Sequence, residues 1–182
     1  MIVANQKRKE NIAEYLLYMW QVEDLIRASN FDMETIRKQV VDRYEQPAEV
    51  KEEIARWYEE LIEMMRTEGV KEEGHIQLNK NVIIVLTDLH LRLLKTPKEM
   101  IYGAVYYKTL PYIVELRSKS GHASIPELET CFSAVYGYIL LKMQQKPVSD
   151  ETMEAIKQIS TFLGILSDKY RLEKEGKLEI ED

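Results

Sequence analysis

The chain has 182 residues, a formal net charge of −6 and a hydrophobic content of 45%, which is enough apolar material for one sizeable globular core. The acidic balance disfavours non-specific nucleic-acid binding, which needs clustered lysine and arginine, so we expect no nucleic-acid partner. The single cysteine, Cys131, cannot form an intrachain disulfide, and the N-terminal residues lack the order of a secretory signal, so we expect a cytoplasmic protein.

Apolar spacing predicts three helices in the first seventy residues. The first spans about residues 9–28, and the second spans about 33–44 with Asp32 as its N-cap. The third begins at Pro47, a residue well suited to a first helical turn. Its apolar residues are spaced by four and three, as in a coiled-coil seam: Val50, Ile54, Trp57, Leu61 and Met64.

Residues 76–95 leave two interpretations open. The β-branched run at 82–85 is typical of a buried strand, but the apolar stretch continues to Leu94 without a turn signal. No second strand-like run is present to pair with it, so we predict a central buried helix. Asp88, His90 and Arg92 interrupt the stretch, and we therefore expect no membrane span.

Three further helices complete the chain. Thr96 is expected to cap the fifth helix with a glutamate three residues on, and Pro111 should kink that helix and leave the Tyr107 carbonyl without its usual partner. Ser124 and Ser149 are the expected caps of the sixth and seventh helices. The seventh carries its own seam: Ile156, Ile159, Leu163, Leu166 and Tyr170.

These elements predict an all-α, single-domain bundle of about seven helices over residues 1–172, with the fourth and fifth helices most buried. The acidic residues 173–182 are expected to form a frayed tail. Gly103, Gly137 and Gly164 lie inside predicted helices, which suggests close helix approach. On that hypothesis, replacing Gly137 with leucine lowers the melting temperature.

The familiar catalytic and metal motifs are absent, so we expect no cofactor and no metal, and we assign no catalytic residue. His75 follows Glu72 at the spacing seen in di-iron bundles, but the pair occurs once and spans a glycine. His122 lies in a polar turn and is expected to be exposed. Cys131 is surrounded by apolar helix positions and is expected to be a small buried hydrophobe.

Five residues are candidates for ligand binding. Residues 75–146 carry 9 basic and 5 acidic side chains, which favours either a basic core segment or an anion-binding cleft. His90 alternatively is a core histidine that hydrogen-bonds a carbonyl or a tyrosine. The tyrosines suit either a pocket wall or ordinary core packing. The candidates lie on the fourth and fifth helices: Asp88, His90, Arg92, Tyr102 and Tyr106.

The opening run from Gln6 to Arg27 resembles the start of an uncharacterised family of all-helical domains of about 180 residues, found mainly in Bacteroides-type bacteria. The resemblance implies a bacterial cytoplasmic protein without an assigned activity. It implies no catalytic residues.

Two hypotheses for function follow. The first is a helical interaction protein, with a homodimer as the candidate assembly, for which Tyr18, Trp20 and Tyr58 are expected surface residues. The second is a small-molecule or anion-binding protein, with enzymatic activity left open, that uses a cleft between the fourth and fifth helices. The absence of a catalytic motif favours a role other than catalysis.

Overall fold

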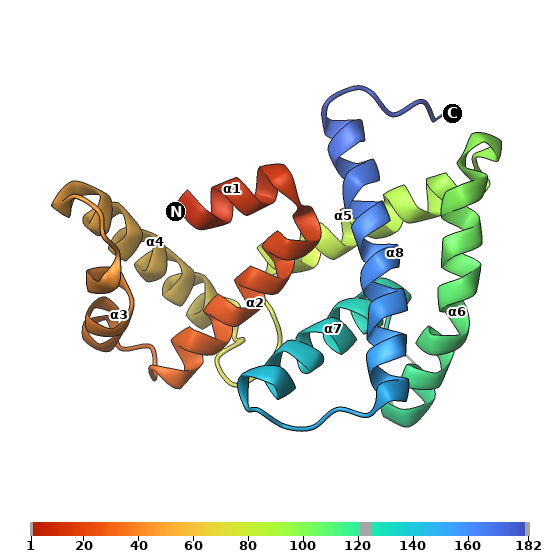
Figure 1. The fold of residues 1–182 in the computed structure, drawn as a ribbon. Coiled ribbons are helices and arrows are strands. Elements are labelled where there is room, and N and C mark those ends of the chain that lie inside the picture. The colour runs from red at the N-terminus through yellow and green to blue at the C-terminus, as the bar shows by residue number, and fades with distance from the viewer. Residues whose placement is uncertain (1, 121–124, 181–182) are drawn as a thin grey trace. The chain divides into compact units, whose positions relative to one another are not determined.

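The computed structural model describes residues 2–120 and 125–180 (Figure 1). Within these ranges every regular element is helical: eight α-helices and two short 3₁₀ helices are present and no strand. The predicted all-α fold class is therefore confirmed. His122 and Ser124 lie outside the described residues.

The chain divides into two compact units. The first comprises Met1–Glu10 and Glu14–Val82, and the second comprises Asn11–Ala13 and Ile83–Asp182. One boundary therefore falls inside helix α5 (Gln77–Lys95), which contributes its first turns to the first unit and the rest to the second.

The chain begins with two helices where the sequence predicted one. Helix α1 (Ile2–Glu10) is separated from α2 (Ile12–Ala28) by the single residue Asn11. The Asn11 side chain accepts a hydrogen bond from the Ala13 amide at 3.0 Å. Asn11 therefore acts as an N-cap of α2, a role that asparagine often has. The sequence predicted one helix here because the apolar stripe continues along α2.

The first unit continues with α3 (Met33–Gln39), the 3₁₀ helix η1 (Val41–Arg43) and α4 (Ala48–Thr67), and α3 packs against both η1 and α4. Asp32 caps α3 as predicted, because its carboxylate accepts the amides of Glu34 and Thr35. The α-helical part is shorter than expected, since the chain turns into η1 after Gln39.

Helix α4 buries a face that differs from the predicted seam. Trp57 and Met64 are only half-buried. The buried residues are Ile54, Ala55, Tyr58, Leu61, Ile62 and Met65. The expectation that Tyr58 and Trp20 are surface residues was wrong, because both are 2% exposed. Tyr58 hydrogen-bonds Tyr18 inside the unit, which satisfies its hydroxyl.

Helix α5 settles the ambiguity at residues 82–85 in favour of a helix. It is not buried all round. Leu86, Leu89 and Leu93 are almost inaccessible, whereas Ile84 and Leu91 are half or more exposed. The prediction of a central buried helix therefore holds for one face of α5 and is wrong for the other.

The second unit is built mainly on three helices. The 3₁₀ helix η2 (Pro97–Glu99) leads into α6 (Met100–Ser120), and α7 (Glu127–Met143) and α8 (Asp150–Lys174) follow. The three α-helices pack pairwise, and Figure 1 shows α8 lying alongside α6. The predicted seam of α8 is confirmed for Ile156, Ile159, Leu163 and Leu166, which are all buried.

The predicted caps of this unit have mixed outcomes. Ser149 caps α8 by accepting the Thr152 amide. The Thr96 side chain does not cap η2, because its hydroxyl donates to the Arg92 carbonyl at 2.9 Å. The N-cap of α7 is Pro126, which has no side-chain acceptor to offer. Both helices instead start at a proline, whose fixed φ suits the first turn of a helix.

The glycine hypothesis was wrong in its physical reason. A Cβ built on Gly103, Gly137 or Gly164 meets no described atom within 4 Å. None of these glycines is therefore required for a close approach of two helices.

Candidate interaction surface on helix α6

Helix α6 has apolar residues on two sides, and only one side is covered by the fold. The covered side carries Tyr102, Tyr106 and Ile113, which are all buried. The uncovered side repeats with spacings of four, three, four and three, as a coiled-coil seam does. We call this side the α6 face: Met100, Ala104, Tyr107, Pro111 and Val114.

Every residue of the α6 face is exposed. Met100 is 79% accessible, Tyr107 64% and Val114 57%, and the neighbouring Ile101 is 80% accessible. Single exposed apolar residues are ordinary on protein surfaces, but a contiguous apolar strip marks an interaction site. The prediction that this helix is among the most buried was therefore wrong for one side, and that side is the feature that the sequence missed.

Pro111 lies on this exposed side, and α6 continues through it from Met100 to Ser120. Proline has no amide hydrogen, so it cannot donate to the Tyr107 carbonyl. Tyr107 is exposed as well, which lets water satisfy that carbonyl. A proline therefore destabilises the helix less at this exposed position than it would at a buried one.

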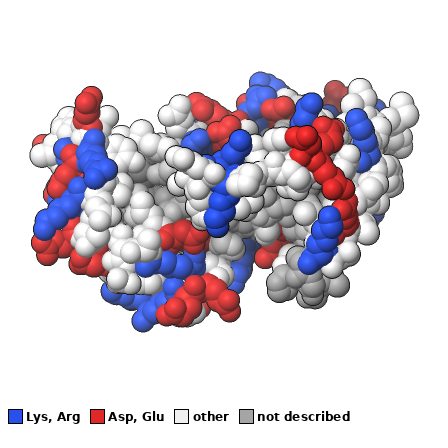
Figure 2. Space-filling view, turned by 60° about the horizontal axis from the view of Figure 1, so that its bottom comes forward, with Lys and Arg blue, Asp and Glu red and all other residues white. Residues whose placement is uncertain are grey.

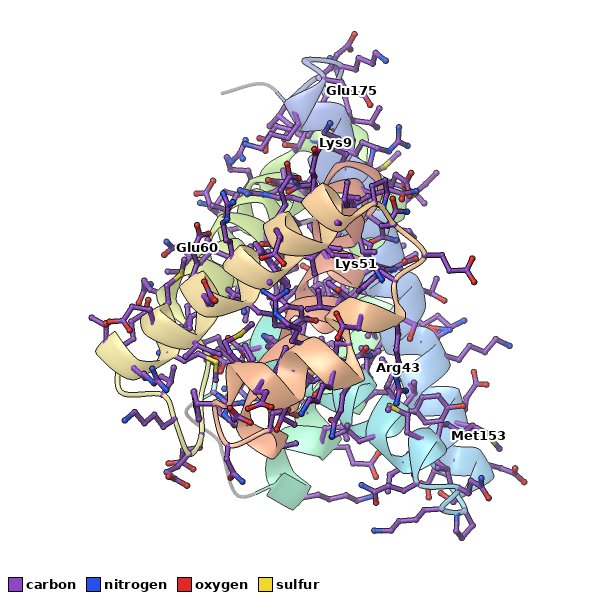
Figure 3. The ribbon with its side chains drawn as sticks, turned by 90° about the vertical axis from the view of Figure 1, so that its left-hand side faces the viewer. Lys9, Arg43, Lys51, Glu60, Met153 and Glu175 are labelled. Carbon is purple, nitrogen blue, oxygen red and sulfur yellow. The ribbon has the colours of Figure 1, made fainter. Side chains whose placement is uncertain are left out.

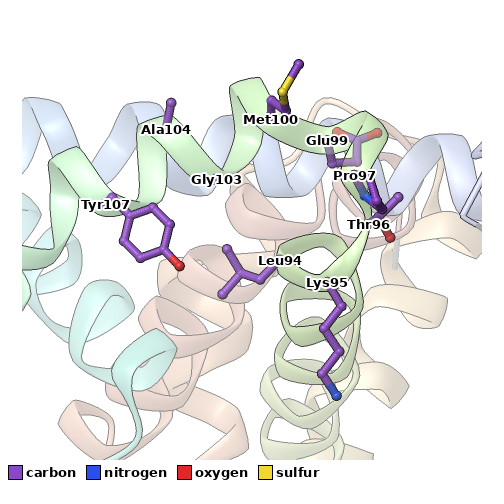
Figure 4. A pocket seen from close by; sticks show the side chains of 9 residues that line it. All are labelled: Leu94, Lys95, Thr96, Pro97, Glu99, Met100, Gly103, Ala104 and Tyr107. Carbon is purple, nitrogen blue, oxygen red and sulfur yellow. The ribbon is translucent and has the colours of Figure 1, made fainter.

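A pocket of about 340 Å³ opens where the end of α5 meets the start of α6 (Figure 4). Leu94 and Tyr107 point toward each other across it, and the Lys95 side chain points away. The other lining residues are Thr96, Pro97, Glu99, Met100, Gly103 and Ala104. A cleft between the fourth and fifth predicted helices therefore exists, but none of the five predicted ligand-binding residues lines it.

Asp88 and Arg92 form an ion pair on the surface of the second unit. The Arg92 Nε donates to Asp88 at 2.9 Å, and another guanidinium nitrogen donates to Glu173 at 2.5 Å. These bonds to carboxylates raise the pKa of Arg92, the Glu173 bond most. The guanidinium is therefore already paired with two carboxylates of its own chain.

His90, Tyr102 and Tyr106 lie together in the core of the second unit. His90 Nδ1 is hydrogen-bonded to the Tyr102 hydroxyl at 2.6 Å, and the Tyr106 hydroxyl donates to Glu127 at 2.7 Å. The rings of all three contact Phe162. Burial lowers the pKa of His90, although the Glu127 carboxylate opposes this in part. Burial likewise raises the pKa of Tyr102, so both groups are neutral at pH 7.

The five predicted residues thus form two groups. His90 and Arg92 are two positions apart on one helix, and such residues do not share a face. Asp88 and Arg92 form the exposed group and make ion pairs. His90, Tyr102 and Tyr106 form the buried group, and His90 hydrogen-bonds a tyrosine, as the alternative interpretation of His90 expected. Ligand binding by these residues stays a prediction.

The first unit contains a buried carboxylate cluster that sequence reasoning missed. Glu23 of α2 is inaccessible, and its Oε1 accepts the Ile76 amide at 3.0 Å and the Asn79 side-chain amide at 2.8 Å. Its Oε2 lies 2.5 Å from His75 Nδ1, and the His75 ring stacks on Trp20 at 4.0 Å. The sequence did contain a signal for the burial of Glu23, because Glu23 shares a helical face with the apolar residues Met19 and Ile26, which are buried.

A smaller cleft of about 190 Å³ lies in the same unit, among α1, α2, α4 and the first turn of α5. The half-buried Trp57 and Met64 line it together with Leu78. Glu60, which projects from α4 in Figure 3, also lines it. Two half-buried residues of the predicted α4 seam, Trp57 and Met64, therefore form part of the wall of this cleft.

Charge and metal chemistry add no further site within the residues that the structure describes. Acidic and basic side chains are intermixed on the face in Figure 2, with wide uncharged areas between them. No cluster of three or more His, Cys, Asp or Glu side chains suits a metal ion there, and none of the helices in these ranges is long and apolar enough to cross a membrane. Burial raises the pKa of the Cys131 thiol to about 12, so it is no nucleophile at neutral pH.

Comparison with known proteins identifies one family. The family of a domain of unknown function, DUF4924, matches residues 1–177. No curated protein and no solved structure matches the chain. The match extends over both compact units and agrees with the resemblance of the opening residues to a family without an assigned activity. The chain belongs to the DUF4924 family.

Proposed function

We propose that this protein is a helical interaction module that self-associates through the α6 face. The observation that carries the proposal is the exposed seam from Met100 to Val114, whose spacing is that of a helix that packs on another helix. The same helix is covered on its other side by α7 and α8. The uncovered side is thus a complete apolar strip on an element that is already held in place.

The energetics favour a partner for this surface. Each square ångström of apolar surface removed from water stabilises an association by about 25 cal/mol. The exposed side chains of Tyr107 and Val114 are large, and a facing helix would cover them. Because α6 is held by the fold, binding requires little ordering of the backbone.

The chemistry of the remaining candidates supports a binding role over catalysis. The buried histidine is neutral and paired with a tyrosine, the cysteine is a protonated thiol, and Arg92 is held between two carboxylates. The histidine and the arginine therefore already have partners within the fold, and the thiol is buried and protonated. The α6 face, by contrast, is left uncovered.

We predict that Tyr107→Glu and Val114→Glu weaken self-association, because each places an unpaired carboxylate in the apolar contact. Sedimentation equilibrium and light scattering over a concentration series should show a dimer for the wild type. Each variant should dimerise at least about tenfold more weakly. Both positions are exposed, so each variant should remain folded as a monomer and keep the far-UV circular dichroism spectrum of the wild type.

Met143→Glu is the matched control. Met143 is 71% exposed at the end of α7 and lies outside the seam, so this variant should dimerise as the wild type does. A wild-type protein that remains a 21.4 kDa monomer at the highest attainable concentration would contradict the proposal.

A further inference from the structure

We propose that two copies of the chain pair antiparallel through the C-terminal half of α6, with Lys108 of each copy opposite Glu115 of the other. The inference rests on the proposed function and adds the orientation and register of the two α6 helices. It follows from the charges that border the α6 face.

One edge of the α6 face carries two opposite charges one heptad apart. Lys108 directly follows Tyr107 and Glu115 directly follows Val114, so both occupy the same position relative to the seam. Both side chains are exposed. Glu115 also forms an ion pair with Lys119 of its own helix at 2.5 Å.

Antiparallel pairing makes these two charges complementary. In such a pair, equivalent edge positions of the two helices face each other across the seam. When Pro111 of one helix packs opposite Val114 of the other, Lys108 lies opposite Glu115. The two-fold axis repeats the contact, so one arrangement gains two ion pairs.

The alternative arrangements gain none. A shift by one heptad, with Tyr107 opposite Pro111, places Lys108 opposite Lys108 of the second copy and is repulsive. A parallel pair places the edge residues opposite Gly103 and Leu110, which carry no charge. Charge pairs of this kind contribute little to affinity but select register and orientation.

The position of α5 is consistent with this register. The end of α5 adjoins α6 along the pocket, whose lining reaches only to Tyr107. The proposed overlap is centred between Pro111 and Val114, beyond that point. A second helix at this position therefore meets the part of the α6 face that α5 leaves open.

Charge reversal tests the register. Lys108→Glu and Glu115→Lys should each weaken the dimer about tenfold at low salt, because each converts two attractive contacts into two repulsive ones. The double variant should recover the wild-type dissociation constant. An equimolar mixture of the two single variants should also dimerise as the wild type does. In each heterodimer, opposite charges face each other at both edge contacts, whereas like charges face each other in the homodimers.

Met100→Glu separates this register from those that use the whole helix. Met100 lies outside the proposed overlap, so the variant should change the dissociation constant less than about twofold, whereas Val114→Glu dissociates the dimer. If Val114→Glu dissociates the dimer but the charge reversals leave it unchanged, the antiparallel register is overturned and the interaction surface stands. If Val114→Glu leaves the dimer intact, both proposals fail.

Discussion

Glu23 links two segments of the first unit through one carboxylate. Its three hydrogen-bonding partners come from residues 75–79, more than fifty positions along the chain. One of them is the Ile76 amide, directly before the start of α5, so α2 supplies the cap that the local sequence does not. A buried carboxylate that is fully hydrogen-bonded holds its neighbours in one arrangement, and its removal leaves their donors unpaired.

We predict that Glu23→Ala lowers the free energy of unfolding by about 2–4 kcal/mol, because it leaves buried donors without an acceptor. Urea denaturation would measure the change. Glu14→Ala is the control, since Glu14 forms an exposed pair with Lys7 at 2.8 Å and should cost about 0.5 kcal/mol or less. Equal effects of the two substitutions would show that Glu23 has no special structural role.

His90 is the residue whose protonation should set the acid stability of the second unit. Burial lowers its pKa below the ordinary 6.5, so at mildly acidic pH the unfolded state binds a proton that the folded state does not. The associated stability is complete well above pH 6.5 and is lost as the pH falls from there toward the folded-state pKa.

We therefore predict that the wild type loses stability as the pH falls through 6.5, the ordinary pKa of histidine, and that His90→Gln loses less over the same range. Urea denaturation at several pH values, from about one unit above that pKa to about one unit below it, gives both curves. Their difference isolates His90 from the other histidines. Parallel curves would mean that His90 has the same pKa in both states.

At the scale of the helix, α4 and α6 show which part of an amphipathic pattern is informative. Both helices have apolar residues over a wide arc, and a helix that is apolar nearly all round is usually buried. The core covers one side of each helix and leaves the other to a cleft in α4 and to solvent in α6. Periodicity therefore predicted the helices and their apolar positions, but not which positions have neighbours.

The glycines inside the helices yield a prediction of the opposite sign to the one that the sequence suggested. We expect Gly137→Ala to raise the free energy of unfolding by about 0.5–1 kcal/mol, because alanine favours the helix and its Cβ meets no described atom within 4 Å. Thermal and urea denaturation would measure it.

Gly69→Ala is the matched control. A Cβ there also meets no described atom within 4 Å, but the backbone has φ +71°, which disfavours alanine by about 1 kcal/mol. It should destabilise the protein. A loss of stability in Gly137→Ala would indicate a packing requirement at that position.

At the scale of the whole molecule, the chain forms two compact units that share one continuous helix, α5. The family match extends over both units, so both are part of the family's domain. The α6 face and the His90 cluster lie in the second unit, and the Glu23 cluster lies in the first. Self-association through α6 therefore needs only residues of the second unit.

Local chemistry in the sequence determined the helical class, the caps at Asp32 and Ser149 and the buried seam of α8, because each depends on residues within one or two turns. The partners of Glu23, the uncovered side of α6 and the separation of Asp88 and Arg92 from the tyrosines depend on contacts between distant segments. Only the tertiary structure decided these, because an apolar or charged residue looks the same in a sequence whether or not the fold supplies its neighbour.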